Sequence, residues 1–246
     1  MDDHMRRRIQ KALRSGKLPN MRKPVFTSGY VPPATGVAHA RLVGYFELGT
    51  HEEEFEGMTR DREKVALVFE LSGLGYGPRI DGAIAIPQRL TVQETLNMGP
   101  NSSFFQLFGV MNYAGKATHM AELLGEAFIV EVFHKKSKDG KKVYANLKGP
   151  NGYNVKGTTV QDPLSGKPIV IDVQSAITEL KAFIWDIADK EMWDSIYIPG
   201  EWEERKDEKT GEVILEARTK NVIQQKLMSA KNWLGSPAHR AITPIG

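Results

Sequence analysis

Two stretches of the chain alternate between apolar and mixed side chains, and this alternation constrains the fold more than any other feature. They are residues 36–50 and 64–71. Successive side chains of a β-strand point to opposite faces, so a period of two predicts half-buried strands. The acidic run 51–56, followed by Gly57, predicts a loop that joins them as an antiparallel pair. In the first strand we expect Ala38, Ala40, Leu42, Phe46 and Leu48 to point inward and His39, Arg41, Val43, Tyr45 and Glu47 to point outward.

Between residues 87 and 125 the apolar spacing lengthens to that of a helix. Ser102 or Ser103 can cap a helix over residues 104–111. Residues 118–124 predict a second short helix, which Gly125 closes. The sheet therefore carries a helical insertion.

The remainder of the chain mixes strand and helix signals. Residues 126–148 contain two strand-like runs around an Asp-Gly turn, which predicts a hairpin. Residues 173–202 predict a helical stretch followed by a tryptophan-rich loop and a strand. Residues 219–235 predict a helix that Thr219 caps. The sequence as a whole predicts a mainly β chain with inserted helices, in the α+β class.

Three alternating glycines, Gly73, Gly75 and Gly77, follow the second strand and raise the question of a phosphate-binding loop. A dinucleotide fingerprint requires a further glycine at position 78 and a helix after it. Position 78 is Pro78, and the sequence beyond it is not amphipathic. No Gly-Lys-Ser/Thr run is present either. We therefore expect a loop that joins two elements and no nucleotide cofactor.

Composition excludes several classes of protein. The 246 residues contain no cysteine, which removes disulfides, thiolate nucleophiles and cysteine-ligated metal centres. No stretch approaches the roughly 20 apolar residues of a membrane span, so no membrane partner is expected. The N-terminus lacks the apolar core of a secretory signal, and we expect a cytoplasmic protein.

Residues 6–23 hold eight Lys or Arg and no acidic residue. They form either a solvated tail or an arm attracted to a polyanion.

The outward face of the predicted sheet combines aromatic and basic residues. Proteins that bind single-stranded nucleic acid combine these two kinds of residue, because unpaired bases stack on aromatic rings and each nucleotide carries a phosphate that basic residues contact. No obvious recognition helix for duplex DNA is present. The candidate nucleic-acid-binding residues are Arg41, Tyr45, Phe133, Lys135, Lys136, Lys142, Tyr144 and Lys148.

Enzyme motifs are absent from the sequence, and we predict no catalytic site and no metal. Histidines are scattered, and no serine lies in a Gly-x-Ser-x-Gly run. Asp186, Asp189, Glu191 and Asp194 lie close together near two tryptophans. Paired carboxylates of this kind could bind magnesium in a nuclease, but an acidic surface loop anchored by the tryptophans is the preferred interpretation.

The order of these segments resembles phage-encoded single-stranded-DNA-binding proteins with an OB-fold. The resemblance covers roughly residues 31–236. It rests on the runs "GVAHARLVGYFELGTHEEE", "EKVALVFELSG", "LLGEAFIVEVFHKKSKDGKKVYANLKG", "MWDSIYIPGEWEE" and "TKNVIQQKLMSAKNWLGSP" taken together.

The resemblance implies a five-stranded OB-fold barrel with inserted helices and a C-terminal helical and strand extension. The expected divisions are a basic N-terminal arm (1–30), an OB-fold domain (31–173) and an extension packing on the barrel (174–246). The implied function is coating single-stranded DNA during phage replication or recombination in the host bacterial cytoplasm, without a cofactor. Arg41, Tyr45 and Tyr144 would lie on the ligand-facing side.

Other partners and functions remain open at this point. Phage replication proteins are candidate partners, and a homodimer is a candidate because symmetric dimers are common. The alternative function is a phage interaction or scaffold protein that uses the aromatic strand face for a protein partner. RNA in place of DNA is also open, because stacking and phosphate contacts do not read the 2′-hydroxyl.

Overall fold

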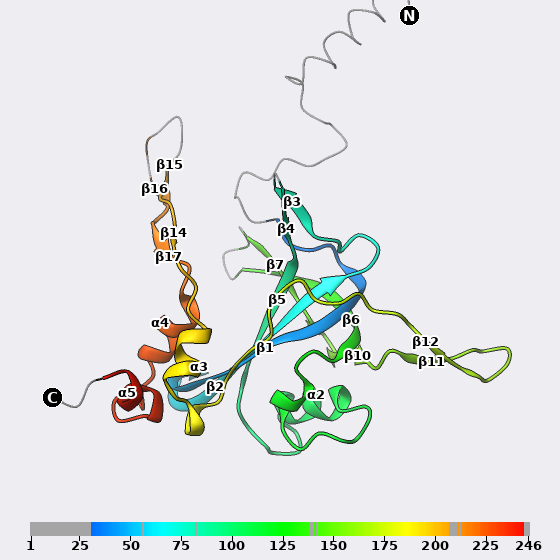
Figure 1. Ribbon diagram of the computed structural model, residues 1–246, viewed down its shortest axis with the longest axis horizontal. Coiled ribbons are helices and arrows are strands. Elements are labelled where there is room, and N and C mark those ends of the chain that lie inside the picture. The colour runs from blue at the N-terminus through cyan, green and yellow to red at the C-terminus, as the bar shows by residue number, and fades with distance from the viewer. Residues whose placement is uncertain are drawn as a thin grey trace, which may run out of the picture. The chain divides into compact units, whose positions relative to one another are not determined.

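The computed structural model describes residues 31–55, 57–81, 83–137, 140, 142–206, 211 and 213–243. The predicted basic arm, residues 1–30, lies outside the described residues. Residues Pro33–Gly246 cluster as one compact unit. This unit is mainly β, with a large antiparallel sheet and few helices, as the sequence predicts (Figure 1).

The large sheet has the strand order β10-β6-β1-β2-β5, with β7 paired to β6 and β13 paired to β1. All its ladders are antiparallel except that between β1 and β13. Among the described residues no ladder joins β5 to β7, so the sheet does not close on itself. The strands are β1 (Gly36–Phe55), β2 (Met58–Ser72), β5 (Gln88–Thr95), β6 (Ala127–Lys136), β7 (Val143–Asn146), β10 (Val155–Lys156) and β13 (Lys181–Phe183).

A β-bulge at Val43 reverses the alternation of β1. The pairing of β1 with β2 skips from Leu42 to Gly44 and again from Glu47 to Gly49, so the residues between the two shifts point to the faces opposite to those the sequence pattern predicts. Tyr45 therefore joins Leu42 in the core, and Phe46 faces the other side of the sheet. The expectation that Tyr45 points outward is wrong for this reason.

Because of the bulge, β1 and β2 separate two hydrophobic cores. The first core lies between the large sheet and the helical insertion, and its largest fully buried side chains include Tyr45, Phe69, Phe104 and Phe128. The second core lies between the sheet and the C-terminal extension. It contains Phe46, Leu48, Ala66, Phe183, Ala188, Trp193, Ile196, Leu227, Ala230, Trp233 and Ala238.

The helical insertion follows the sequence prediction closely. Helix α2 (Ser103–Met111) begins after Ser102, whose hydroxyl accepts a hydrogen bond from the amide of Phe105. A short 3₁₀ helix η1 (Met120–Leu123) follows, and Gly125 adopts a positive φ of 84° shortly after it. The glycine-rich segment after β2 is a loop, as expected, and the buried Tyr76 anchors it through a hydrogen bond to the carbonyl of Ala34.

The segment after residue 172 is not a helix, contrary to the sequence prediction. Residues 173–180 form an extended strap whose backbone is held by two charged side chains that face each other across β1 and β2. The Arg41 guanidinium donates to the carbonyls of Val173 and Gln174, at 2.6 and 2.7 Å. The Glu70 carboxylate accepts from the amides of residues 177 and 178, both at 2.7 Å. These tertiary hydrogen bonds override the local helical pattern.

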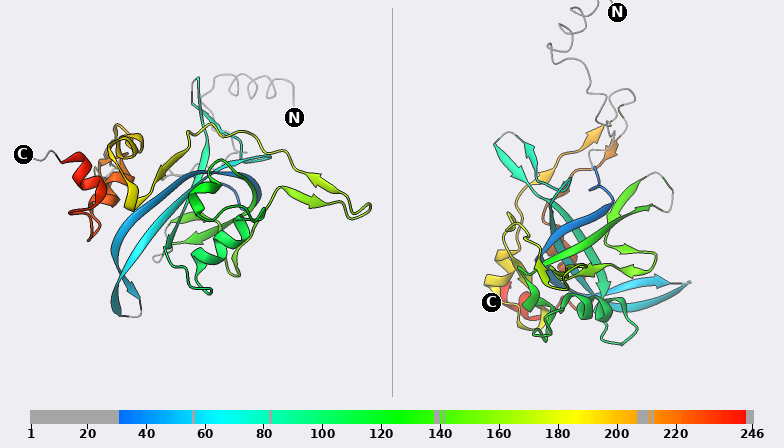
Figure 2. Two further views of the ribbon diagram at one scale, coloured as in Figure 1. Left: turned by 60° about the horizontal axis from the view of Figure 1, so that its bottom comes forward. Right: turned by 90° about the vertical axis from the view of Figure 1, so that its right-hand side faces the viewer.

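The rest of the unit consists of short helices and two-stranded ribbons. The helices are η2 (Trp185–Ile187), α3 (Lys190–Ser195), α4 (Val222–Met228) and α5 (Pro237–Ile242). Several ribbons extend from the sheet, and the ribbons of β14 to β17 extend from the helices α3 and α4 (Figures 1 and 2). Their strands are β3 (Arg79–Asp81), β4 (Ile84–Ile86), β8 (Lys148–Gly149), β9 (Gly152–Tyr153), β11 (Thr159–Gln161), β12 (Pro168–Val170), β14 (Glu201–Trp202), β15 (Arg205–Lys206), β16 (Val213–Leu215) and β17 (Arg218–Thr219).

Candidate nucleic-acid interface

The β6–β7 hairpin carries most of the candidate residues at the surface. Lys135 lies directly opposite Tyr144 in the ladder, so their side chains share one face. Tyr144 is 46% exposed, and Lys135, Lys136 and Lys142 are exposed as well. By the alternation of β7, Lys142 belongs to the same face as Tyr144, whereas Lys136 points to the other. The hairpin therefore presents an aromatic ring between lysines.

Phe133 supports this face and is half-buried. A side-chain carbon added at Gly149 would lie 2.6 Å from the Phe133 ring, so the ring packs directly on the glycine backbone. Only a residue without a Cβ permits this approach. Phe133 thus holds β8 against the hairpin and exposes part of its ring.

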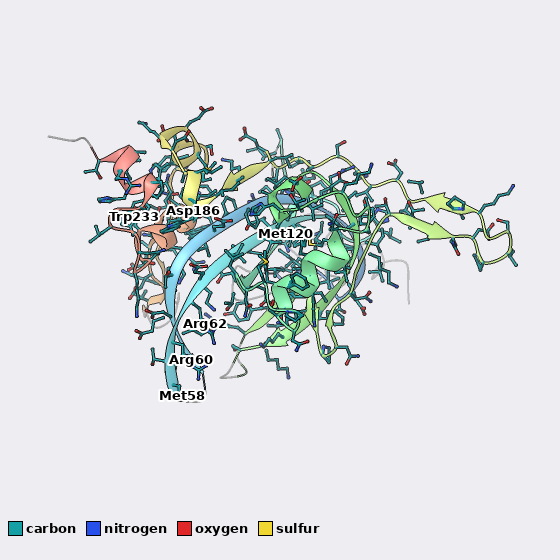
Figure 3. The ribbon with its side chains drawn as sticks, turned by 90° about the horizontal axis from the view of Figure 1, so that it is seen from below. Met58, Arg60, Arg62, Met120, Asp186 and Trp233 are labelled. Carbon is teal, nitrogen blue, oxygen red and sulfur yellow. The ribbon has the colours of Figure 1, made fainter. Side chains whose placement is uncertain are left out.

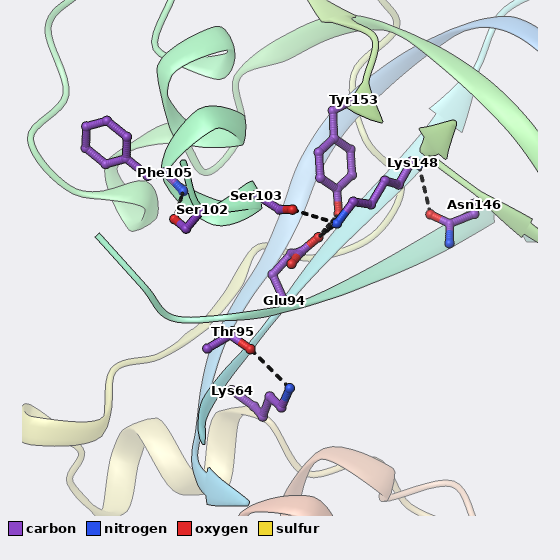
Figure 4. A network of polar contacts seen from close by, with 9 residues as sticks. All are labelled: Lys64, Glu94, Thr95, Ser102, Ser103, Phe105, Asn146, Lys148 and Tyr153. Atoms are coloured by element: carbon purple, nitrogen blue, oxygen red, sulfur yellow. Dashed lines mark hydrogen bonds and ion pairs between the residues drawn. The ribbon is translucent and has the colours of Figure 1, made fainter. Parts of the chain in front are cut away.

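Lys148 belongs to a network at the base of the hairpin (Figure 4). Its ammonium group lies 2.8 Å from Glu94 Oε1 and 2.7 Å from Ser103 Oγ. The hydroxyl of Tyr153 donates to the same oxygen of Glu94, at 2.6 Å. Burial, followed by this contact with the carboxylate, raises the pKa of Tyr153, which keeps the phenol protonated as a donor. The network ties β5 to β8 and β9 where no ladder joins them.

Beside this network lies an open groove of about 770 Å³. Glu94 and Ser103, the partners of Lys148, line it, so the base of the hairpin borders the groove. Its lining residues are polar except for Met58, and they come from the end of β1, the start of β2, the end of β5 and the start of α2. The lining residues are Glu53, Met58, Arg60, Arg62, Glu94, Thr95, Asn97, Asn101, Ser102 and Ser103.

One wall of the groove is an arm formed by β1 and β2 beyond the sheet, residues 50–55 and 57–63 (Figure 2, left). Met58, Arg60 and Arg62 follow one another on one face of the arm (Figure 3). Glu53, which also lines the groove, is paired with Lys64 at 2.7 Å. The groove face of the arm therefore has an excess of positive charge.

The N-terminal end of helix α2 forms part of the opposite wall of the groove. The helix has no acidic residue in its first turn, and Ser102 and Ser103 at its start line the groove. The N-terminal end of a helix carries a partial positive charge and amide donors, both of which favour anions. Arginines and this helix end thus border the same groove.

Two of the predicted residues do not belong to this surface. Tyr45 is fully buried, and its hydroxyl donates to Glu47 Oε1 at 2.9 Å, so its ring offers no face for stacking. Arg41 donates to three backbone carbonyls, those of Gly125, Val173 and Gln174. Its guanidinium holds the strap and is already hydrogen-bonded within the fold.

Two of the four carboxylates in residues 186–194 make structural contacts. Asp189 caps α3 by accepting from the amide of Met192 at 2.8 Å, and Asp194 pairs with Lys190. Within the described part of the chain, no group of three or more His, Cys, Asp or Glu is arranged to hold a metal ion.

Sequence reasoning missed Arg60 and Arg62. The signal was available, because the run "MTRDREK" places Met58, Arg60, Arg62 and Lys64 at alternate positions, as a strand with one basic face requires. The acidic run before it predicted a loop at residues 51–56, whereas β1 continues to Phe55.

No protein-family model matches the chain, and no curated protein or solved structure matches it. Within the described residues no helix is long and apolar enough to cross a membrane.

Proposed function

We propose that this protein binds single-stranded DNA, with little sequence preference, along the β6–β7 hairpin and the neighbouring groove. The observation that carries the proposal is the half-exposed Tyr144 opposite Lys135, on a hairpin whose base borders a groove lined by two arginines. Phosphates would contact the lysines and arginines, and bases would stack on Tyr144.

The order of the strands supports an OB-type barrel as the scaffold. Strands β1, β2 and β5 form an antiparallel meander, α2 lies in the link to the next long strand, and β6 returns beside β1. OB-folds are partly open five-stranded barrels that bind oligonucleotides at the second and third strands and at the loops joining the first to the second and the fourth to the fifth strand. On this assignment the arm and the β6–β7 turn are those two loops.

The chemistry of the surface favours a single strand over a duplex. An unpaired base can reach a tyrosine ring and stack on it, which is worth about 1–3 kcal/mol per base. In a duplex, the neighbouring base pairs cover both faces of each base, so a tyrosine ring cannot stack on them. Lysines and arginines gain affinity by releasing counterions from phosphates, independently of sequence.

The setting that we propose is phage DNA replication or recombination in the bacterial cytoplasm. It rests on the resemblance of the segment order to phage single-stranded-DNA-binding proteins, and phage replication proteins or a second copy of the chain would then be natural partners.

A protein-interaction function is the second candidate, and the β11–β12 ribbon favours it. Its exposed apolar side chains include Val160, Leu164, Ile169 and Val170, of which Leu164 is 96% exposed. Exposed apolar residues grouped on one element are a feature of protein-binding surfaces. This function predicts a stable complex with a protein that is indifferent to added oligonucleotide.

The proposal is tested by fluorescence anisotropy of a labelled oligo-dT with three forms of the protein. Replacing both Arg60 and Arg62 with alanine should weaken binding about tenfold or more at low salt. The matched control replaces two exposed lysines outside the groove lining, Lys116 and Lys167, and should change affinity less than twofold. Equal losses in the two variants would mean that net charge, and not this site, binds the DNA.

A further inference from the structure

The arm that carries Arg60 and Arg62 has an acidic back. Residues that are paired across β1 and β2 share a face, and Glu52 is paired with Asp61. Alternation places them on the face opposite Arg60 and Arg62. Glu54 and Glu63 belong to the same back face. The arm thus separates cations toward the groove from carboxylates behind it.

One lysine of the C-terminal extension contacts this acidic back. The Lys231 ammonium group lies 2.8 Å from Glu52 Oε2 and 2.5 Å from Asp61 Oδ1. Hydrogen bonds with Asp61 and Glu52 raise the pKa of Lys231, so the lysine remains charged. A single cation therefore faces two carboxylates and offsets half of their charge.

The backbone around Lys231 fixes this contact in place. The Lys231 amide donates to the carbonyl of Thr50 at 2.8 Å, and the amide of Thr50 donates to Asn232 Oδ1 at 2.8 Å. Just before, Gly49 adopts a φ of +79° with the Trp185 ring directly against its Cα. The second core therefore anchors the root of the arm.

We propose that Lys231 is a positioning residue for the nucleic-acid groove: it neutralises Glu52 and Asp61 behind Arg60 and Arg62, and so sets the affinity of the groove for phosphate. The inference rests on the proposed function. Charges act over about 10 Å at 0.1 M salt and about 30 Å at 0.01 M salt, so carboxylates on the back of the arm act on a phosphate held at its front most strongly at low salt. Without Lys231, both carboxylates would act on a phosphate held by the arginines. The C-terminal extension then has a role in binding although it lies behind the groove.

The test compares Lys231→Met, Lys231→Arg, and Lys231→Met combined with Glu52→Gln and Asp61→Asn. Oligo-dT affinity is measured at low and high salt, and the urea midpoint is measured for each variant. Lys231→Met should weaken binding about three- to tenfold at low salt and less at high salt, because salt screens the carboxylates. Lys231→Arg keeps the positive charge and should bind oligo-dT with the affinity of the wild type.

The triple variant decides between charge neutralisation and a merely structural role. With the carboxylates removed, the lysine should be dispensable. The triple variant should bind at least as tightly as the wild type, because the net charge of the three positions rises from −1 to 0. Binding as weak as that of Lys231→Met would overturn the proposal.

A readout without DNA separates this inference from the proposed function. His51 lies opposite Arg62 in the ladder. Exposing two carboxylates near it should raise its pKa in an NMR titration of Lys231→Met, and the triple variant should reverse the shift. If the His51 pKa shifts in this way while the wild type does not bind oligo-dT, the proposed function fails and the neutralisation stands. If the wild type binds DNA and neither affinity nor pKa responds to Lys231→Met, the role of Lys231 is refuted.

Discussion

Tyr45 and Tyr144 are both strand tyrosines of the predicted interface, and the structure places them in opposite environments. Tyr45 is fully buried and donates to Glu47, whereas Tyr144 is 46% exposed. Replacing Tyr45 with phenylalanine removes only the hydroxyl. It leaves one oxygen of a nearly buried carboxylate without that donor, although the amide of Trp185 still donates to the other oxygen at 2.7 Å. We expect a loss of about 1–3 kcal/mol in the free energy of unfolding.

Larger truncations should separate the two residues further. Tyr45→Ala removes a whole ring from the first core and should cost about 3–5 kcal/mol. Tyr144→Ala should change the free energy of unfolding by about 1 kcal/mol or less, because the side chain is only partly covered. Its loss of a stacking platform should instead weaken DNA binding by about 1–3 kcal/mol, or about 5- to 150-fold.

The assay combines urea unfolding, followed by tryptophan fluorescence, with oligo-dT anisotropy. Three of the four tryptophans, Trp185, Trp193 and Trp233, belong to or pack on the second core, so their emission reports loss of the fold. Tyr45→Phe should lower the urea midpoint and leave the affinity of the folded protein unchanged. A Tyr45→Phe variant of wild-type stability that binds DNA weakly would refute the assignment of Tyr45 to the core.

Four further predictions follow from the same structure. Glu70→Ala removes the acceptor of two strap amides and should cost about 2–3 kcal/mol in urea unfolding, with faster proteolysis of residues 173–180; unchanged cleavage would contradict the role of Glu70 in holding the strap. Gly49→Ala places a carbon 2.4 Å from a tryptophan ring at positive φ and should abolish two-state unfolding or cost more than about 3 kcal/mol; a stable variant would show that the second core packs differently. Burial lowers the pKa of His51 below 6.5, so the unfolded chain binds more protons and stability falls as the pH drops through about 6.5. His51→Gln should therefore flatten the pH dependence of the urea midpoint between about pH 7.5 and 5.5. An unchanged pH dependence would exclude His51 as its source. Lys135→Ala and Lys142→Ala should each reduce the salt slope of DNA binding by about 0.7, whereas an unchanged slope would remove them from the interface.

The sequence predicts the parts of the fold that local patterns determine. The period of two locates β1 and β2, the serine before an apolar helical run locates α2, and the Asp-Gly turn locates the β6–β7 hairpin. In each case the residues that give the signal lie in or next to the element that they predict.

Long-range interactions account for the errors. The bulge at Val43 is invisible in a pattern of apolar and polar residues, and it moves Tyr45 from the surface to the core. The strap at residues 173–180 has a helical pattern, but hydrogen bonds from Arg41 and Glu70, more than one hundred residues away in sequence, hold it extended. Such bonds depend on the register of β1 against β2.

The candidate site divides in the same way. The hairpin lysines and Tyr144 are found from the sequence because they lie on one continuous local element. Lys148 is also found, but its pairing with Glu94 and Ser103 comes from strands and a helix that only the fold brings together. The sequence analysis did not predict the groove face of the arm. It interpreted the acidic run 51–56 as a loop and therefore did not extend the strand pattern to Arg60 and Arg62.

The most direct test of the account is a competition experiment on the full chain. Labelled oligo-dT is titrated with the protein at several salt concentrations, and a duplex of equal length is added as competitor. With on the order of 4–6 phosphates contacted, the logarithm of affinity should fall with the logarithm of salt at a slope of about −3 to −4, and the duplex should fail to displace the single strand. A slope near zero, or a duplex that competes equally, would contradict single-stranded DNA binding.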